Sequence, residues 1–471
     1  MQLDPARFKE SVEAALADRS LKRAIDITTL TAERKRAAVV AEFAEFEVAR
    51  DYGRRIKDHV IEHLGHYLLE FERNATASGA TLHWAANAEE GRRIVVDICK
   101  AAGVRRVTRA KSMVGEEIGL PEALADAGIE RVETDLAEHI IQLFDDPPSH
   151  IVWPAMHRSR EQVSALFKEH HRNPNQEESI ADLVESARRE LRDKYLSSDA
   201  SITGGNFLIA DTGTVCTVTN EGNLELGVIP ARLHIVTTGI EKLVPSIAHC
   251  FELLRLLARS AVGAELTAYT SFFRGARQHG DQDGPEALHI VLVDNGRSRM
   301  LNDEMREMLR CIRCGACLNH CAVYRQIGGH AYGSIYPGPM GAVITPELVG
   351  LKHAKDLPEA CSLNGHCEEV CPVKIPLPKL LLRLRQQGRS EGLQPRTARL
   401  GFGLWASVVT RPRLYRAASS MGVWALRRLR RGGWITRLPL VGGWTRYRDM
   451  PGPSGKTFMQ LYREKRGGSP K

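Results

Sequence analysis

The chain has 471 residues, of which 43% are hydrophobic and 26% charged, a composition typical of a globular protein with more than one domain. No uninterrupted apolar run approaches the roughly 20 residues that span a bilayer, and L-G-F-G-L-W-A-S-V-V-T is stopped by Arg411 and Pro412. Composition therefore argues against an integral membrane protein. The formal net charge of +8 is uneven: from Lys379 to Lys471 there are 21 Lys and Arg against three acids, which gives +18 there and −10 elsewhere.

Residues 1–75 are predicted to be helical, because they are rich in Ala, Glu, Arg and Leu. From residue 76 to 295, short apolar runs such as N-F-L-I-A-D and A-L-H-I-V-L-V-D alternate with helical patterns such as L-P-E-A-L-A-D-A-G. This alternation predicts an α/β domain with a mostly parallel sheet covered by helices.

Signals for a ligand site in this α/β domain are weak. Lys111, Glu116 and Glu117 follow one predicted strand, and Gly204 and Gly205 precede another. Loops at strand ends are the usual ligand sites of such sheets.

Two turn-like segments follow. Asp211–Thr214 is predicted to be a tight turn, and N-E-G-N at 220–223 a hairpin connection. Because the sequence has no G-x-G-x-x-G after a strand and no Walker A sequence, we expect no bound nicotinamide, flavin or ATP.

Four cysteines then occur with gaps of two, two and three residues, at Cys311, Cys314, Cys317 and Cys321. This spacing is typical of iron-sulfur ligands, and the fourth cysteine of such a run ligates the other cluster of a two-cluster fold. A second cysteine run is therefore expected.

The second run, C-S-L-N-G-H-C-E-E-V-C-P, has Asn364 where a regular motif has its middle cysteine. Crossed ligation gives one [4Fe-4S] cluster four thiolates and the other only three, which suits a [3Fe-4S] centre. The C-x5-C-x3-C-P spacing resembles iron-sulfur subunits of succinate dehydrogenase and fumarate reductase. The alternative is a second [4Fe-4S] cluster with water or a non-cysteine ligand, with Asn364 and His366 nearest in sequence. The first set is Cys311, Cys314, Cys317 and Cys371, and the second is Cys321, Cys361 and Cys367.

Other roles for these cysteines fit less well. Disulfides need an oxidising compartment, whereas the N-terminus M-Q-L-D-P-A-R-F-K-E has no apolar signal region, so a cytoplasmic, reducing setting is expected. Structural zinc needs four ligands and not seven. Cys99, Cys216 and Cys250 stand alone in apolar surroundings and are expected to be buried, unreactive thiols.

The cysteine-rich domain is assigned to residues 296–390. Helices are predicted directly before Cys311 and after Pro372, as around an α-helical dicluster ferredoxin. Between the runs, H-A-Y-G-S-I-Y-P-G-P-M-G-A-V-I-T-P is too apolar for a flexible linker, so it is expected to pack around the clusters.

The last region, residues 391–471, is basic and contains Trp405, Trp424, Trp434 and Trp444. Such a segment suits an anionic membrane surface, an acidic partner subunit or nucleic acid. A solvated extension that packs over the cysteine-rich domain remains an equal alternative.

Several segments together resemble one known family. K-S-M-V-G-E-E-I-G-L, E-T-D-L-A-E-H-I-I-Q-L, H-I-V-T-T-G-I-E-K-L-V-P-S, C-I-R-C-G-A-C-L-N-H-C and G-G-W-T-R-Y-R-D-M-P are similar to the lactate-utilisation protein B family over nearly the full chain. The resemblance implies a LUD-type α/β domain related to the NagB/RpiA/CoA-transferase group, a two-cluster domain and a family-specific C-terminal region. It also implies that the cysteine at Cys361 replaces one expected at Asn364.

By the same resemblance, the chain is expected to be an electron-transfer subunit of a complex that oxidises L-lactate to pyruvate, with two partner proteins and a quinone as a possible acceptor. Its expected place is the cytoplasm, with peripheral contact at the inner face of the membrane. The alternatives are a subunit for another hydroxy acid such as glycolate and, less favoured because no helix-turn-helix is evident, an iron-sulfur sensor that binds nucleic acid.

Overall fold

The computed structural model describes residues 3–172, 179–438, 445 and 448–467. They fall into two compact units, Met1–Glu391 and Gly392–Lys471. The predicted N-terminal helices are present, as α1 (Phe8–Ala17), α2 (Arg19–Ala41), α3 (Phe46–Glu62) and α4 (Leu64–Ala77). A short turn of 3-10 helix, η1 (Pro5–Arg7), precedes them. The backbone N–H groups at the start of α2 are satisfied by the Asp18 side chain, which accepts from Ser20 and Leu21.

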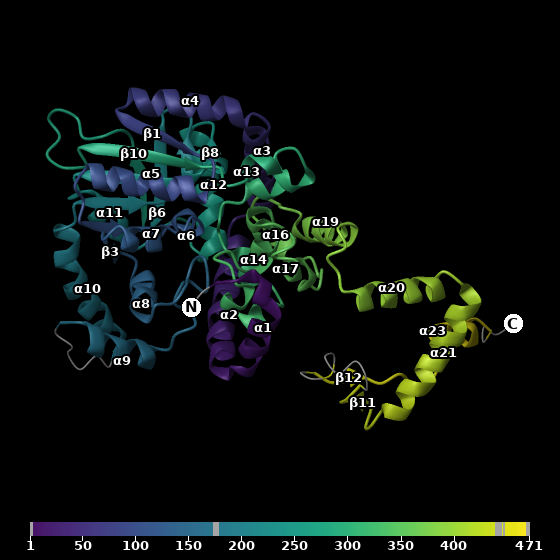
Figure 1. Cartoon of the computed structure of the whole chain (residues 1–471). Coiled ribbons are helices and arrows are strands. Elements are labelled where there is room, and N and C mark those ends of the chain that lie inside the picture. The colour runs from purple at the N-terminus through teal and green to yellow at the C-terminus, as the bar shows by residue number, and fades with distance from the viewer. Residues whose placement is uncertain (1–2, 173–178, 439–444, 446–447, 468–471) are drawn as a thin grey trace. The chain divides into compact units, whose positions relative to one another are not determined.

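The α/β layer is built on a six-stranded sheet in which every neighbouring pair is parallel (Figure 1). Its strand order is β1 (Ala80–Ala85), β10 (Ala287–Val293), β7 (Leu233–Gly239), β4 (Ala200–Thr203), β2 (Arg106–Arg109) and β3 (Glu130–Glu133). The mostly parallel sheet expected from the alternating pattern is confirmed. From β2 the chain passes to β3 on one side and later to β4 on the other, so the strand order reverses at β2.

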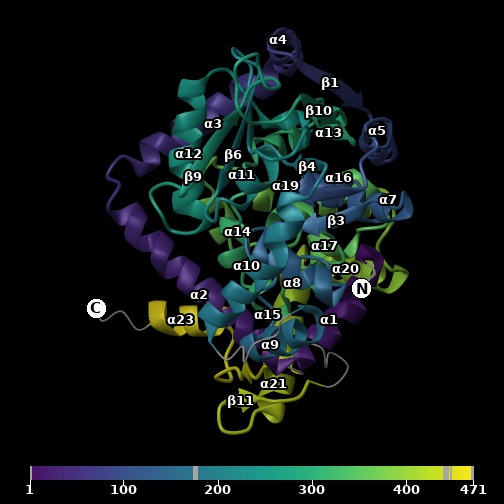
Figure 2. The same ribbon diagram turned by 90° about the vertical axis from the view of Figure 1, so that its left-hand side faces the viewer.

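Both faces of this sheet are covered. One face packs on α5 (Ala88–Ala101), α6 (Met113–Glu117) and α7 (Leu120–Asp126), with Val95, Ile118 and Leu124 fully buried against the strands. The other face meets α3, α4 and a second sheet in the order β8 (Leu243–Val244), β5 (Phe207–Ile209), β6 (Thr214–Thr219) and β9 (Tyr269–Phe273). The helix α12 (Ile247–Ala261) lies beside α3 (Figure 2).

The two turn-like segments differ in outcome. Asp211–Thr214 does form the turn between the antiparallel strands β5 and β6, and its Gly213 has φ 66° at a point where a Cβ would lie 2.1 Å from the backbone nitrogen of Ala75. The predicted hairpin at 220–223 is wrong, because β6 is followed by the helix α11 (Asn223–Val228). Gly222 in the left-handed conformation starts α11, and burial of Leu224 and Val228 holds it.

Between β3 and β4 lie α8 (Leu136–Phe144), α9 (Arg160–His170) and α10 (Ile180–Leu196), which share a small apolar core of their own. The segment between α8 and α9, residues 145–159, runs toward the cysteine-rich part of the chain.

The cysteine-rich part is a set of short helices packed on α1, α2 and α3 (Figure 1). They are α13 (Arg297–Met300), η3 (Glu304–Arg310), α14 (Ala316–Asn319), α15 (Tyr324–Ile327), η4 (His330–Tyr332), α16 (Gly338–Val349), α17 (Asp356–Glu359), α18 (His366–Glu369) and α19 (Leu377–Ser390). Both predicted flanking helices exist, although the one before Cys311 is a 3-10 helix. The apolar segment between the runs packs as expected, with Tyr336, Met340 and Val343 almost fully buried.

The second unit contains α20 (Arg396–Val409), α21 (Pro412–Leu429), the two-residue strands β11 (Trp434–Ile435) and β12 (Met450–Pro451), and α23 (Phe458–Gly467). Neither α20 nor α21 has a buried residue. Trp444 and part of the closing G-G-W-T-R-Y-R lie outside the described residues. A search of the described helices finds none that is both long and apolar enough to cross a membrane.

Candidate iron-sulfur site

The two cysteine runs share one local backbone fold. Arg313 and Leu363 both adopt the left-handed conformation, with φ 59° and 58°, and two residues later Gly315 and Gly365 have φ 75° and 85°. Each glycine begins a four-residue helix, α14 in the first run and α18 in the second. The two runs are therefore structural counterparts, residue by residue.

This correspondence assigns each position of the irregular second run. Cys361 is the counterpart of Cys311, so it is not a substitute for a missing middle cysteine. Asn364 is the counterpart of Cys314. The Asn364 side chain is exposed, and its Oδ1 accepts a hydrogen bond from the backbone N–H of His366 at 3.4 Å.

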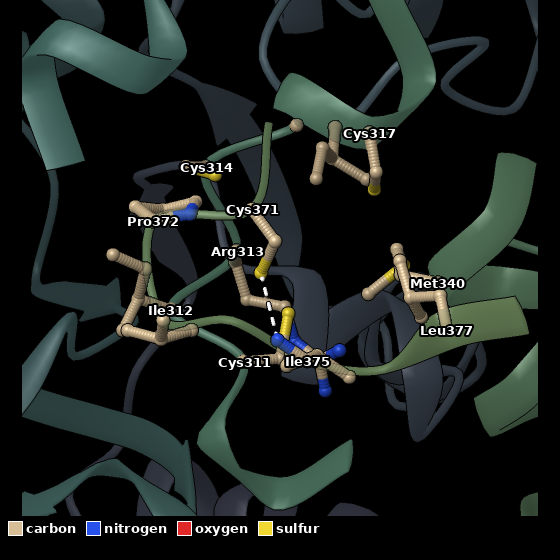
Figure 3. Close-up of a pocket in the computed structure, with 13 residues that line it drawn as sticks. Cys311, Ile312, Arg313, Cys314, Cys317, Met340, Cys371, Pro372, Ile375 and Leu377 are labelled. Carbon is tan, nitrogen blue, oxygen red and sulfur yellow. Dashed lines mark hydrogen bonds between the residues drawn. The ribbon is translucent and has the colours of Figure 1, made fainter. Parts of the chain in front are cut away.

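Four cysteines from the two runs converge on one small cavity (Figure 3). They are Cys311, Cys314 and Cys317 from the first run and Cys371 from the second. The rest of the lining is almost entirely apolar, and includes Ile312, Met340, Val373 and Leu377. The backbone N–H of Ile375 donates to the Cys371 Sγ at 3.4 Å.

This arrangement fits a cluster better than a single ion. Four thiolates bound about 2.3 Å from one zinc ion lie within about 4 Å of each other. Among the described residues, no three His, Cys, Asp or Glu side chains are placed to hold one metal ion. A cubane spreads its thiolates over separate irons, which suits four cysteines around an apolar cavity.

The other three cysteines also come together. Cys361 and Cys321 lie close enough to Cys367 for their charges to raise the pKa of its thiol. Cys361 raises the pKa of Cys321 in the same way. The backbone N–H of Tyr324 donates to the Cys321 Sγ at 3.4 Å, and that of Leu363 to the Cys361 Sγ at 3.2 Å. The structure thus places Cys321, Cys361 and Cys367 near one another, while the division of the seven cysteines into two crossed ligand sets stays a prediction.

Most of these thiols are hard to ionise without a bound cation. Burial raises the pKa of Cys314 and of Cys367 to about 12, and neighbouring thiols act in the same direction. Burial likewise raises the pKa of Cys371 to about 11, although backbone N–H groups oppose it. Metal binding to such thiols releases protons, because the thiolate is the ligand. By contrast, the three cysteines outside the two runs are fully buried, as expected. They are Cys99, Cys216 and Cys250.

Two N-terminal arginines that no sequence motif singles out hold the second run in place. Arg50 on α3 donates from Nε to the carbonyl of Cys371 at 3.0 Å and from Nη2 to the carbonyl of Glu369 at 2.7 Å. Arg36 on α2 donates from Nη2 to the carbonyl of Val370 at 3.2 Å. These contacts join parts of the chain more than 300 residues apart, which no local spacing can indicate.

A loop from the α/β layer covers the first run. A Cβ built at Gly315 would lie 3.1 Å from Val152 and 3.3 Å from Ile151. His150 of the same loop accepts the N–H groups of Val152 and Trp153 at its Nδ1, which leaves Nε2 to donate to Asn319 Oδ1 at 3.2 Å. Burial, with the nearby charge of Lys111, lowers the pKa of His150 to about 3, so the ring is neutral.

The corresponding face of the second run is open. A Cβ built at Gly365 would meet no atom of the described residues within 4 Å. Ser362 and Asn364 are exposed, as are Glu368 and Glu369 on α18. The two runs thus have similar backbone angles, but other residues pack over the first run and not over the same face of the second.

A buried ion network joins the first run to the α/β layer. Arg297 is fully buried and donates to Glu117 at 2.6 Å and to Glu241 at 2.6 Å. Tyr336 Oη donates to Glu117 Oε2 at 2.7 Å, and Arg313 Nη2 lies 3.4 Å from Glu241 Oε1. Burial opposes ionisation of Glu241, but Arg297 and Arg313 outweigh it and hold its pKa at about 2.

The strand-end residues singled out in the α/β layer lie behind the covering loop. Lys111 Nζ donates to the carbonyl of Val152 at 2.8 Å. Glu116 is instead paired with Arg109, which also binds Glu133 at 2.7 Å. Gly204 packs against Ser112, where a Cβ would lie 3.1 Å from the hydroxyl oxygen. The point where strand order reverses therefore connects with the first cysteine run through the loop.

Comparisons with known families cover nearly the whole chain. A LUD domain model matches residues 68–293, a 4Fe-4S dicluster domain model residues 307–375, and a model for the C-terminal part of lactate utilisation protein B residues 384–467. The dicluster match spans both cysteine runs and so supports iron-sulfur chemistry at this site. It does not establish the number or type of clusters.

Whole-chain relatives agree with these domain matches. Lactate utilization protein B of Bacillus licheniformis is 41% identical and covers 99% of this chain and 98% of its own. The same protein of Shouchella clausii is 40% identical with 99% coverage of both, and the uncharacterized electron transport protein YkgF of Escherichia coli is 40% identical, covering 97% and 96%. A solved DUF162 family structure from Deinococcus radiodurans covers 49% of this chain and 98% of its own, but at 16% identity and TM-score 0.28 it carries no argument. With three matching domains in order and full-length relatives near 40% identity, the chain belongs to the lactate utilisation protein B family.

Proposed function

We propose that this chain is the iron-sulfur electron-transfer component of a system that oxidises L-lactate to pyruvate together with two partner proteins. The observation that carries the proposal is the convergence of four cysteines from two runs on one apolar cavity, with the three remaining cysteines of the runs gathered beside it. The names of the relatives, lactate utilization protein B and electron transport protein, supply the metabolic context.

The proposed ligands follow from this grouping. Cys311, Cys314, Cys317 and Cys371 hold one [4Fe-4S] cluster, and Cys321, Cys361 and Cys367 hold a second cluster with three thiolates. We favour a [3Fe-4S] centre there, because the position that corresponds to Cys314 is occupied by Asn364, which has an amide in place of a thiol. When bound, such clusters accept and release single electrons, which side chains alone do not.

The protein's own residues shield and orient this site. The loop at Ile151 and Val152 packs over Gly315 in the first run. Arg36 and Arg50 fix the carbonyl groups at the end of the second run and place two positive charges beside it. Burial and backbone N–H donors to sulfur are the means by which a protein adjusts the reduction potential of such a centre.

The test is reduction by substrate. Reconstituted protein is mixed anaerobically with the two purified partner proteins, and the visible absorption of the clusters is followed after addition of L-lactate. We expect bleaching with L-lactate, and glycolate serves as the comparison substrate. Bleaching by dithionite but not by L-lactate overturns the proposal, and bleaching by glycolate alone favours the alternative hydroxy acid.

The same proposal has three further parts. They are a relation of the α/β layer to the NagB/RpiA/CoA-transferase group, quinone as the electron acceptor, and peripheral contact with the membrane. Support for membrane contact comes from the second unit, where α20 and α21 carry exposed apolar side chains beside many arginines. Trp405 is 63% exposed and Trp424 56%. Basic helices with exposed Trp and Leu bind anionic bilayer surfaces.

Vesicle flotation measures this contact. We expect the protein to float with vesicles that contain anionic lipid, and the double variant Trp405→Ala, Trp424→Ala to float several-fold less. Exposed Trp84 of the α/β layer gives the control variant Trp84→Ala, which should float like the wild type. Equal flotation of the wild type and the double variant contradicts membrane contact through these helices.

A further inference from the structure

Arg313 has a buried guanidinium group whose hydrogen bonds are incomplete. The side chain is 8% exposed and lines the cysteine cavity (Figure 3). Its Nη2 is held by Glu241 at 3.4 Å, and its guanidinium carbon lies 4.5 Å from the centre of the Tyr336 ring. Its Nε and Nη1 are buried with no hydrogen-bond partner in the part of the chain that the structure describes.

Two unpartnered donors on a buried cation are costly, so proteins rarely leave them unused. The cavity that Arg313 lines is otherwise apolar, apart from the sulfur atoms of its four cysteines. Sulfur is thus the acceptor that the cavity offers.

The backbone conformation does not explain why this residue is arginine. Leu363, its counterpart in the second run, has the same left-handed φ and no polar side chain. The turn therefore requires a left-handed residue, whereas the guanidinium is particular to the first run. It is also firmly positioned, because Arg297 holds Glu241 and Glu117 holds Tyr336.

We propose that Arg313 donates a hydrogen bond from one of its unpartnered nitrogens, Nε or Nη1, to a sulfur atom of the iron-sulfur group held by Cys311, Cys314, Cys317 and Cys371. This inference rests on the ligand sets of the proposed function and adds a residue that sets the properties of one of them. Donors and positive charge near sulfur favour the reduced form, which carries one more negative charge. Arg313 therefore raises the reduction potential of the first centre, and Leu363 has no such effect on the second.

The experiment is a redox titration of the reconstituted full-length protein, followed by low-temperature EPR. In Arg313→Leu we expect the equilibrium constant for reduction of the first centre to fall at least tenfold. For one electron this shifts its reduction potential by about 59 mV to a more negative value. Arg313→Lys keeps the positive charge but loses the planar guanidinium group. Its reduction potential should therefore lie between those of the wild type and Arg313→Leu. Leu363→Ala is the matched control, and neither centre should shift.

Unchanged potential of the first centre in Arg313→Leu, at full iron content, overturns the proposal. If that variant loses iron, wild-type protein labelled with 15N-arginine gives the answer: pulsed EPR should detect nitrogen coupling to the reduced first centre, and Arg313→Lys should lack it. Labelled wild type without that coupling also overturns the proposal. Protein that binds no iron at all contradicts the proposed function instead, so the two failures are distinguishable.

Discussion

The two cysteine runs have nearly the same backbone and opposite surroundings. The first is covered by the 150–153 loop and tied to the α/β layer through Arg297, whereas the second is held from behind by Arg36 and Arg50 and open in front. A motif therefore fixes the ligand geometry, and the rest of the chain decides solvent access and charge at each copy. This difference makes several predictions, of which the first has the largest expected effect.

Asn364→Cys should make the second run regular. A thiolate at the position that matches Cys314 adds a ligand, so a three-iron centre should become a four-iron centre. We expect more iron per chain and loss of the EPR signal that a three-iron centre gives in its oxidised state. The matched control is Ser362→Cys, which adds a thiol to the same run at an exposed position that corresponds to Ile312 and not to a cysteine. Iron content unchanged in Asn364→Cys would falsify the three-iron assignment.

Glu117→Ala should weaken the attachment of the first run to the α/β layer. It leaves Arg297 buried with one of its two carboxylate partners gone, and breaking a buried pair costs about 3–5 kcal/mol of unfolding free energy. Thermal unfolding of the reconstituted protein measures the loss. The control is Glu10→Ala, whose partner Arg7 is exposed, and we expect almost no change there. An equal effect of both variants contradicts the role of the buried network.

Stability should also depend on pH through His150 in the loop over the first run. The unfolded ring takes up a proton near pH 6.5, but its folded pKa is about 3, so the unfolded state binds more protons between these values. Unfolding free energy therefore falls as pH drops below about 6.5, with up to about 1.4 kcal/mol per pH unit from this residue.

Other buried histidines contribute in the same direction, so the measurement is a difference between variants. His150→Asn retains an acceptor for the two loop N–H groups and should reduce the slope of stability against pH between about pH 5 and 6.5. The exposed His279→Asn should leave the slope unchanged. A slope unaffected by His150→Asn means that the ring is not held neutral.

The smallest effect concerns the open face. Reversing the charge of Glu368 and Glu369 on α18 to Lys should slow oxidation of the reduced protein by the hexaammineruthenium cation and speed oxidation by ferricyanide, roughly threefold each at low salt. Glu89→Lys on α5 is the control and should alter neither rate. If both double-variant rates match the wild type, electrons do not exchange through this face.

Much of the site was predictable because it is local. The gaps between the cysteines predicted that Cys311, Cys314, Cys317 and Cys371 come together, as they do around one cavity. The apolar residues of the segment between the runs predicted that it packs, and Tyr336 and Met340 are buried. Alternating apolar runs predicted the parallel sheet, since that pattern reflects burial on both faces. The hairpin at 220–223 failed because a Gly in the left-handed conformation serves a helix start as well as a turn.

What escaped prediction depends on contacts between distant segments. Nothing near Arg50 in the sequence refers to Cys371, and nothing near His150 refers to Asn319. Arg313 stands inside the motif, but the cysteine spacing does not indicate its burial or its unpartnered nitrogens. The spacing alone already placed Asn364 where a regular run has its middle cysteine, and the backbone angles agree with that match to Cys314.

The hydrogen bonds from Arg36 and Arg50 have a consequence for biogenesis. Their acceptors, Val370 and Cys371, are synthesised more than 300 residues after them. During translation α2 and α3 must wait without their final partners until the second run has left the ribosome, and contacts of such sequence separation form slowly. These N-terminal helices can therefore close over the last cysteine only after residue 371 has been synthesised.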